Sequence, residues 1–395
     1  MTAAAAERFP RIDTGAPRYA VGLMAGTSLD GIDAALVCIE GAGDAIRIQT
    51  QATHYQPYTP DERTGLLRLI ESGSLADLCA WDAYLGERFA QAAQAVIQKA
   101  SPPRVDCIGS HGQTAWHAPN AQVLGTPTPN TLQIGQPNVI AARVGAPGVA
   151  DFRTRDMAYS GQGAPLVPSV DWLLLRNDTE PRVALNLGGM ANLTILPAGG
   201  APDAICAFDT GPANALIDLA VQRGTGGTQT YDRDGALADS GAVHPPLLAW
   251  LLAHPYFGQP PPKSTGREVF GRALLDAIHA QFPDLPLPTL VATLTELTAA
   301  TIADALQRWV TPTCPVRRVI VSGGGLHNRA LMRRLAARLP DVALESSAAY
   351  GVDPDFKEAI AFAVLADRFL QGLPATYPST TGVRRPTLAG KLALP

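Results

Sequence analysis

Three glycine-rich turns, each of which follows an apolar run, contain the residue types that bind a phosphate chain. The first is Gly26-Thr27-Ser28-Leu29-Asp30-Gly31, the second is Gly188-Gly189-Met190-Ala191-Asn192, and the third is Ser322-Gly323-Gly324-Gly325. Glycine allows backbone amides to close around an anion, while Thr, Ser and Asn side chains supply further donors. The first two turns share one layout, with an apolar strand on either side. This repetition predicts that the two turns bind one phosphate chain between them.

The first turn also brings two carboxylates, Asp30 and Asp33, close to its hydroxyl groups. An aspartate in this position can hold magnesium, usually through water molecules. The alternative is a plain hairpin turn, because Asp-Gly is a common hairpin dipeptide. The glycine–lysine–serine ending of a Walker loop is absent from the sequence. The third turn lies between an expected strand and an expected helix, where it suits the close approach of a base or ribose.

Asp209 follows the expected buried strand 204–208, and open α/β sheets bind their ligands at the carboxyl ends of such strands. We therefore expect its carboxylate at the rim of a cleft, where it acts as a general base on water or on a hydroxyl group. The alternative is that Asp209 caps the helix that follows Pro212. The two phosphate turns favour the general base.

Other polar side chains are candidates for binding a substrate. Arg153 and Arg155 alternate on a segment expected to be extended, which would point both guanidinium groups to one side to grip a carboxylate or phosphate. Glu358 lies in the first turn of an apolar helix, where it is either a partner of the helix dipole or a ligand of a sugar hydroxyl. His111 lacks metal-ligand spacing, so we expect a structural role. The basic segment 263–267 is a solvated loop or, alternatively, a substrate loop.

Alternating strands and helices are expected to position these groups. Turn residues and apolar patterning predict strands within 19–39, 105–108, 183–196, 204–208 and 319–321. The predicted helices cover 75–100, 213–222, 289–310, 328–339 and 355–370. Residues 118–138 are rich in Pro, Thr and Asn and are expected to be a surface excursion. The fold class is therefore α/β, with a mixed sheet in each half and a second half that repeats the architecture of the first.

The composition is that of an ordinary globular protein, with 46% apolar residues, 17% charged residues and a net charge of -4. A length of 395 residues favours two domains, and the balanced charge gives no reason to expect a nucleic-acid partner. Five scattered cysteines without a Cys-x-x-Cys pair indicate reduced thiols in the core and a cytoplasmic location. We expect no signal peptide and no membrane span, because the longest apolar runs, such as 359–366, are short.

Together these motifs resemble the anhydro-N-acetylmuramic acid kinase family, a branch of the actin, sugar-kinase and heat-shock-ATPase superfamily. The resemblance extends from about Val21 to the last few residues. The segments that carry it are 22–31, 110–114, 151–156, 161–168, 186–189, 208–214, 262–268 and 323–325.

The resemblance implies two domains, each built on a ribonuclease-H-like sheet, with ATP and a sugar meeting in the cleft between them. We expect the first domain at 18–160, completed by 375–395, and the second at 161–374. Members of this family open the internal ether bridge of 1,6-anhydro-N-acetylmuramic acid with water and phosphorylate the freed six-position oxygen. The product, N-acetylmuramic acid 6-phosphate, returns bacterial cell-wall sugar to metabolism. The expected cofactors are ATP and Mg²⁺, and the resemblance suggests a homodimer.

The resemblance also implies roles for individual residues. Asp209 would activate water against the anomeric carbon, and Asp30 and Asp209 are the expected magnesium ligands. The expected sugar contacts are Arg155, Glu358, Asp151 and Gln113. The expected ATP contacts are Gly26, Thr27, Ser28, Leu29, Asp30, Gly31, Ile32, Asp33, Gly188, Gly189, Asn192, Gly323, Gly324, Gly325 and Asn328.

Two residues depart from the family pattern: Thr154 stands where arginine is common, and Ala213 stands where glycine is common. Alanine is the mildest replacement for that glycine. Three competing interpretations remain: another small-molecule kinase of the same superfamily, a nucleotide-driven switch or filament protein, and a non-catalytic sugar sensor. A base at Asp209 argues against the sensor, because binding alone needs no base.

Overall fold

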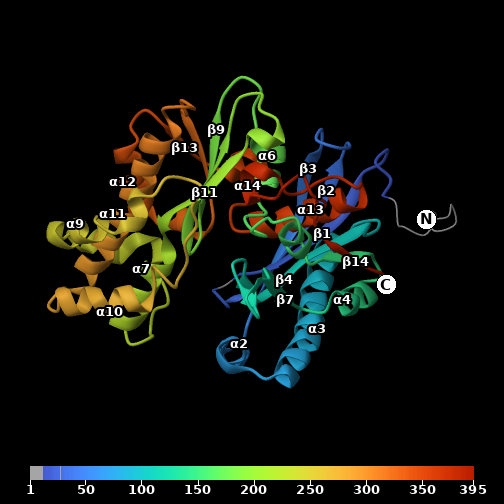
Figure 1. Ribbon diagram of the computed structural model, residues 1–395, viewed down its shortest axis with the longest axis horizontal. Helices are drawn as coiled ribbons and strands as arrows, with labels where there is room; N and C mark the ends of the chain where they lie inside the picture. Colours follow the sequence, from blue (N-terminus) through green and yellow to red (C-terminus); the bar gives the residue numbers. More distant parts are fainter. Residues whose placement is uncertain (1–11, 27) are drawn as a thin grey trace. The chain divides into compact units, whose positions relative to one another are not determined.

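The computed structural model describes residues 12–26 and 28–395, which fold into two compact units. The first contains the residues up to Leu174 together with Phe356–Pro395, and the second is the continuous segment Leu175–Asp355 (Figure 1). These limits differ from the expected boundaries at 160/161 and 374/375. They differ because the amide of Gln162 donates to the carbonyl of Thr381, and because the last long helix packs on the first sheet.

The first unit is built on a seven-stranded mixed sheet. Its strands are β1 (Arg18–Ala25), β2 (Gly31–Glu40), β3 (Arg47–Pro57), β4 (Cys107–Ala118), β7 (Asn130–Ile134), β8 (Gly148–Ala150) and β14 (Lys391–Ala393). The order is β14-β8-β4-β1-β2-β3, with β7 paired to β4; β1 is antiparallel to β2 and parallel to β4. The short strands β5 (Gln122–Val123) and β6 (Thr126–Pro127) pair only with each other.

Helices cover both faces of this sheet. α3 (Leu75–Ala100) and α13 (Lys357–Leu370) pack on the sheet. The unit also contains α2 (Pro60–Ser72), α4 (Pro137–Val144), α5 (Thr154–Ala158) and α14 (Pro378–Thr381), and α6 (Pro168–Leu175) ends at its limit. Leu23 of β1 packs with Phe89 of α3 in one core cluster. Gly22 points to the opposite face, where a Cβ would lie 1.8 Å from the carbonyl oxygen of Ala359 in α13. A Cβ on Gly109 of β4 would lie 1.9 Å from another α13 carbonyl, so both glycines let α13 rest directly on the sheet.

A buried ion pair fastens α13 to the beginning of β1. Arg18 and Asp367 are both fully buried, and the guanidinium donates from Nε to Oδ1 at 2.6 Å and from Nη2 to Oδ2 at 3.2 Å. A charge inside a protein is costly unless it is paired in this way. The pair therefore makes the position of α13 on this sheet specific.

The second unit repeats the strand order of the first. Its strands are β9 (Arg182–Leu187), β10 (Met190–Leu196), β11 (Cys206–Pro212), β12 (Arg318–Ser322) and β13 (Ala343–Ser346). The order is β11-β10-β9-β12-β13, with the first three strands antiparallel and the last two parallel to β9. The path β3-β2-β1-β4-β8 in the first unit has the same order. Both units therefore have the expected ribonuclease-H-like α/β topology.

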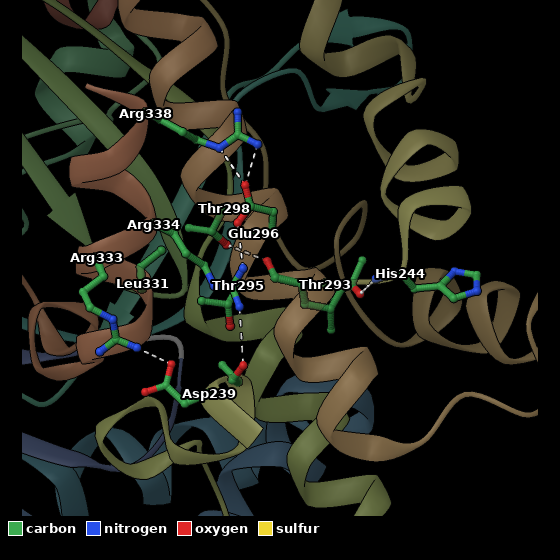
Figure 2. Close-up of polar contacts among 12 residues, drawn as sticks. Asp239, His244, Thr293, Thr295, Glu296, Thr298, Leu331, Arg333, Arg334 and Arg338 are labelled. Carbon is green, nitrogen blue, oxygen red and sulfur yellow. Dashed lines mark hydrogen bonds and ion pairs between the residues drawn. The ribbon is translucent and has the colours of Figure 1, made fainter. Parts of the chain in front are cut away.

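The helices of the second unit are α7 (Asn214–Gly224), α8 (Ala236–Ser240), α9 (Pro245–Leu252), α10 (Arg272–Gln281), α11 (Leu287–Ala305) and α12 (Arg329–Arg338). Arg334 and Arg338 of α12 donate to the two oxygens of Glu296 in α11, at 2.8 and 2.7 Å (Figure 2). Arg333 pairs with Asp239 of α8. These ion pairs join three helices that lie side by side in Figure 2.

One segment of the described residues, Leu287–Val310, is long and apolar enough to cross a membrane. The expectation that every apolar run is too short is therefore wrong for this helix. Within it, 83% of the most apolar window is buried inside the protein, where residues such as Ile302 and Leu306 pack on the second sheet.

Most predicted elements are confirmed, including the helices at 75–100 and 328–339 to within one residue at each end. The expected excursion 118–138 is different, because β7 within it pairs with β4. All five cysteines are free, but Cys79 and Cys206 are exposed, so the expectation that they lie in the core is wrong for these two.

Candidate functional site

The turn between β1 and β2 is held from several sides. The amide of Leu29 donates to the carbonyl of Gly26 at 3.3 Å, and the hydroxyl of Ser28 donates to Asp30 Oδ1 at 2.5 Å. Leu29 has φ 54°, a left-handed conformation that costs a leucine roughly 1–2 kcal/mol. Such strain is common at functional turns. Thr27, which we expected to contact phosphate, lies outside the described residues.

Gln113 is hydrogen-bonded to the turn between β1 and β2. Its side chain is fully buried, and Nε2 donates to the carbonyl of Gly26 at 3.1 Å. Its Oε1 accepts from the hydroxyl of Tyr58 at 3.5 Å. Both ends of the Gln113 amide are therefore used within the protein, where they position the turn, and not only in the expected contact with a sugar.

The two glycines of the first turn have different surroundings. A Cβ on Gly31 would lie 2.6 Å from the carbonyl oxygen of Gln56, so packing alone requires glycine there. A Cβ on Gly26 would meet nothing nearer than 3.6 Å, which leaves its amide open to a ligand. Ile32 is fully buried in the core, so only its backbone is available for a contact.

Asp30 and Asp33 lie near the phenol of Tyr55. Burial, together with these two carboxylates, raises the pKa of Tyr55 to about 12. The phenol therefore stays protonated, and it donates to the carbonyl oxygen of Asp30 at 2.9 Å. The carboxylate of Asp30 itself is exposed, while Asp33 is half-buried.

A buried histidine holds Arg153 in the first unit. His111 Nε2 accepts from Arg153 Nη2 at 2.7 Å, and His111 Nδ1 lies 2.8 Å from the carbonyl oxygen of Gly112. Burial and the neighbouring guanidinium lower the pKa of His111 to about 3, so the imidazole is neutral and donates from Nδ1. Arg153 Nη1 also donates to the carbonyl of Gly163 at 2.7 Å. The prediction of a structural histidine is confirmed.

The expected extended segment around Arg153 and Arg155 is wrong. Residues 154–158 form the short helix α5, because Asp151 Oδ1 accepts from both the amide and the hydroxyl of Thr154, at 3.2 and 2.5 Å. The two arginines therefore do not share a side. Arg153 reaches His111, whereas Arg155 donates to the carbonyl of Leu388 at 3.4 Å.

Asp151, an expected sugar contact, has its carboxylate engaged within the protein. Besides Thr154, it pairs with Lys391 Nζ at 2.5 Å through Oδ2. Burial acts to raise the pKa of Asp151, but the bonds from Lys391 and Thr154 outweigh it and hold the pKa below its usual range. This geometry gives Asp151 a structural role, since it begins α5 and binds the strand β14.

Glu358 lies in the first turn of α13, as predicted. Burial raises its pKa, while Lys357 and Arg153 act in the opposite direction. Lys357 is itself paired with Asp171, at 3.0 Å from Nζ to Oδ1. Among the described residues, no hydrogen bond to the Glu358 carboxylate is formed, which leaves this half-buried group able to accept from a ligand hydroxyl.

In the second unit, polar side chains form one row across four strands. Ser322 of β12 pairs in register with Asn186 of β9, Asn186 pairs with Asn192 of β10, and Asn192 pairs with Asp209 of β11. Directly paired residues point to the same face of a sheet, with Cβ atoms about 4.5–5.5 Å apart. The apolar residues between them, such as Leu193, belong to the core on the other face. Asn186 is a member of this row that the predicted contacts omitted.

Asp209 lies in the middle of β11, not at its end, because the strand continues to Pro212. Its amide donates to the carbonyl of Lys263 at 3.0 Å, and its Oδ2 accepts from the amide of Thr265 at 2.9 Å. Burial raises the pKa of Asp209 to about 6, and Glu268 adds to the rise, while the Thr265 bond and Lys263 oppose it. The first residue of α7 follows Ala213, which makes no side-chain cap, so the alternative of Asp209 as a helix cap is wrong.

The glycines of the second and third turns divide into packed and open positions. Gly188 and Gly189 have only ordinary contacts at 3.4 and 3.5 Å, so packing does not require glycine there. A Cβ on Gly323 would lie 2.8 Å from Leu187, and a Cβ on Gly325 would lie 2.7 Å from it, so packing requires glycine at both positions. Gly323 also has φ 86°. A Cβ on Gly324, by contrast, would meet nothing within 4 Å. At Gly188, Gly189 and Gly324 the local packing leaves room for the ligand contacts that we predict.

Asn328 and Ala213 also have local explanations. Asn328 is the N-cap of α12, and its Oδ1 accepts from the amide of Leu331 at 2.9 Å. This cap accounts for Asn328 without a nucleotide. Ala213, which stands where glycine is common in similar sequences, is fully buried, and its amide donates to the carbonyl of Gly189 at 3.0 Å.

Comparisons with known proteins find relatives over nearly the whole chain. A family model described as anhydro-N-acetylmuramic acid kinase matches residues 18–394. A relative of that name from Caldanaerobacter subterraneus subsp. tengcongensis is 40% identical, covering 98% of this chain and all of the relative. Another, from Xanthomonas campestris pv. campestris, is 47% identical, covering 96% and 98%. A solved structure, the activator of 2-hydroxyisocaproyl-CoA dehydratase from Clostridium difficile, is 10% identical with a TM-score of 0.42 and covers 90% of this chain and 96% of its own.

The fold class is α/β, with a ribonuclease-H-like sheet in each unit and a glycine turn between the first two strands of each sheet. Within that class the chain belongs to the anhydro-N-acetylmuramic acid kinase family, as the match over nearly its whole length shows.

Proposed function

We propose that this chain converts 1,6-anhydro-N-acetylmuramic acid, ATP and water into N-acetylmuramic acid 6-phosphate and ADP, in the recycling of bacterial cell-wall sugar. In this reaction the oxygen of water bonds to the anomeric carbon, and the bond from that carbon to the six-position oxygen breaks. The electron pair of the broken bond stays on the six-position oxygen, which takes the terminal phosphoryl group of ATP. The proton removed from water passes to the base.

The observation that carries this proposal is the environment of Asp209 in a chain of this family. Its carboxylate is held in place by the Thr265 amide, and its pKa is raised to about 6 by burial. A base works best when its pKa lies near the working pH, because it is then ionised and still basic enough to take a proton. These features support Asp209 as the group that removes the proton from water.

We assign the phosphate contacts to the open parts of the turns. The Gly26, Gly188, Gly189 and Gly324 backbones can approach a ligand without a side chain in the way. Asn192 contributes from the polar row of the second sheet. Phosphate transfer in such a site depends mainly on positioning and on stabilising charge, which backbone donors supply without reorganisation.

A magnesium ion fits the donor types of the first turn. Mg²⁺ is usually held by one or two carboxylates together with phosphate oxygens and water. Both candidate carboxylates accept a hydrogen bond, Asp30 Oδ1 from Ser28 and Asp209 Oδ2 from Thr265, and we propose Asp30 as the protein ligand because it is exposed. The bound ion would neutralise charge on the phosphates of ATP.

For the sugar, we propose Glu358 as an acceptor for a hydroxyl group and Arg155 as a donor. Glu358 has the clearer support, because it is half-buried and none of the described residues donates a hydrogen bond to its carboxylate. We also propose a cytoplasmic location and a homodimer. Five free cysteines support the first, and the family resemblance supports the second.

The test is mass spectrometry of the sugar product formed in isotopically labelled water. The protein is incubated with the anhydro sugar, ATP and Mg²⁺, and early time points are read because a free anomeric oxygen exchanges slowly with water. N-acetylmuramic acid in the same water measures that exchange. We expect a product with one phosphoryl group and one solvent oxygen above this background. A phosphorylated product without solvent oxygen would overturn the hydrolytic step, and ATP use independent of sugar would favour the switch or filament interpretation.

A further inference from the structure

The segment Lys263–Gly266, which we call the clasp, is bound to Asp209 and is not a free solvated loop. Asp209 donates its amide hydrogen to the carbonyl of Lys263 at 3.0 Å. The amide of Thr265 returns a bond of 2.9 Å to Asp209 Oδ2. The clasp therefore contacts both the backbone and the carboxylate of one residue, much as a further strand would.

Tyr256 anchors the clasp from the other side. Its hydroxyl donates to the carbonyl of Asp209 at 2.8 Å. Lys263 Nζ donates to the carbonyl of Tyr256 at 3.2 Å and lies 4.6 Å from the centre of the Tyr256 ring. A cation over an aromatic ring adds stabilisation of about 0.5–1 kcal/mol. With both ends held, Thr265 has little freedom relative to the Asp209 carboxylate.

The hydroxyl of Thr265 is the unexplained part of this arrangement. Thr265 Oγ1 is buried, yet it has no hydrogen-bond partner among the described residues. A buried hydroxyl without a partner costs about 1–3 kcal/mol. Native proteins contain few such groups, and each calls for an explanation. Here the unpartnered oxygen belongs to the residue whose amide binds the proposed base.

We propose that Thr265 Oγ1 binds the water molecule that attacks the sugar. This inference rests on the proposed function of Asp209. One hydrogen of the water points to the Asp209 carboxylate, which takes it as a proton, and the other is donated to Thr265 Oγ1. With both hydrogens directed, a lone pair of the water oxygen faces the anomeric carbon. Thr265 itself gains and loses no covalent bond.

The experiment compares Thr265→Val with Thr265→Ser. Both variants keep the amide that binds Asp209, and valine has the shape of threonine without the hydroxyl. We expect Thr265→Val to lower kcat by about 10–100-fold, the scale of loss when a reacting group is poorly placed, with KM for ATP unchanged and a melting temperature no lower than that of the wild type. Thr265→Ser should retain about half of the wild-type kcat or more. Thr228→Val, the same substitution at an exposed threonine outside the clasp, is the matched control and should behave as wild type.

Three results would overturn the inference. The first is a kcat for Thr265→Val within about twofold of wild type. The second is an equal loss in Thr265→Ser, which would indicate shape rather than the hydroxyl. The third is a higher KM for the sugar with an unchanged kcat, which would make Thr265 a sugar contact. Asp209→Asn, assayed in parallel, separates the two proposals. If Asp209→Asn is inactive while Thr265→Val is active, only the role of Thr265 fails, but an active Asp209→Asn removes the base itself.

Discussion

Replacing Asp209 with asparagine should abolish turnover and, at neutral pH, stabilise the protein. Burial raises the pKa of this carboxyl from 3.8 to about 6. A carboxyl with a raised folded-state pKa lowers stability when it is ionised, because the folded protein binds its proton more tightly than the unfolded chain. A shift of about 2 units corresponds to roughly 3 kcal/mol at 1.36 kcal/mol per unit. We therefore expect Asp209→Asn to raise the free energy of unfolding by up to about 3 kcal/mol above pH 6.

The stability gain must disappear in acid. As the pH falls through about 6, the wild-type carboxyl becomes protonated in the folded state, and below about 4 it is neutral in both states. Urea unfolding at about pH 8 and about pH 4 measures the difference between the two proteins. For a unit of this size, each kcal/mol moves the melting temperature by about 2–4 °C. An equal stability of variant and wild type at both pH values would show that the carboxylate is well solvated, contrary to the structure.

The same variant tests the chemistry. Loss of a general base lowers kcat by about 10²–10⁴-fold, and ATP binding should remain. In the wild type, kcat/KM should fall as the pH drops through about 6, where the base becomes protonated. Glu268→Gln is the control, because Glu268 helps to raise the pKa of Asp209. That variant should stay active, and the fall of its kcat/KM in acid should occur at a lower pH than in the wild type. Near-normal turnover by Asp209→Asn, measured with coupled ADP release, would refute the assignment.

Three further substitutions test the glycines and the buried ion pair. Gly324→Ala should fold normally, because the added methyl group meets no protein atom. It should raise KM for ATP about tenfold, because the methyl group blocks the proposed nucleotide. An unchanged KM would argue against that contact. Gly22→Ala should destabilise the first unit by at least about 2 kcal/mol, since its Cβ would lie 1.8 Å from the carbonyl oxygen of Ala359, and urea unfolding would show whether it does. Asp367→Ala leaves Arg18 buried without its partner, so we expect a loss of about 3–5 kcal/mol in the same assay, and a loss below about 1 kcal/mol would contradict the pairing.

The sequence predicts the strand–turn–strand units well because their glycine turns and apolar strands are local features. It predicts the region of Arg153 and Arg155 poorly, since the hydrogen bonds from Thr154 to Asp151 lie at the start of a short helix, α5, where the sequence suggests an extended segment. The pairing of Arg153 with His111 joins residues far apart in the chain, and no local pattern indicates it. In the same way, the basic segment 263–267 has the composition of a solvated loop, and only the fold shows that it binds beside a strand.

The sequence predicts the placement of Asp209 only in part. The apolar run before Asp209 correctly indicates a strand, but that strand continues through Gly211 and Pro212, which propensity treats as breakers. An edge strand tolerates both residues, and β11 lies at the edge of its sheet. Asn186 escapes prediction for a different reason. It joins the polar row only through its register with β10 and β12, which the sequence alone does not specify.

The contact of α13 with Gly22 and Gly109 has a consequence for the order of synthesis. The first unit needs Phe356–Pro395 to cover one face of its sheet, whereas Leu175–Asp355 forms the second unit from continuous chain. A ribosome adds about 5–20 residues each second, so the early strands wait many seconds for their last helix. The later unit can therefore complete its core first, and one face of the earlier sheet stays uncovered until α13 has emerged from the ribosome. A chaperone that binds nascent chains would find its longest-lived target in β1 and β4.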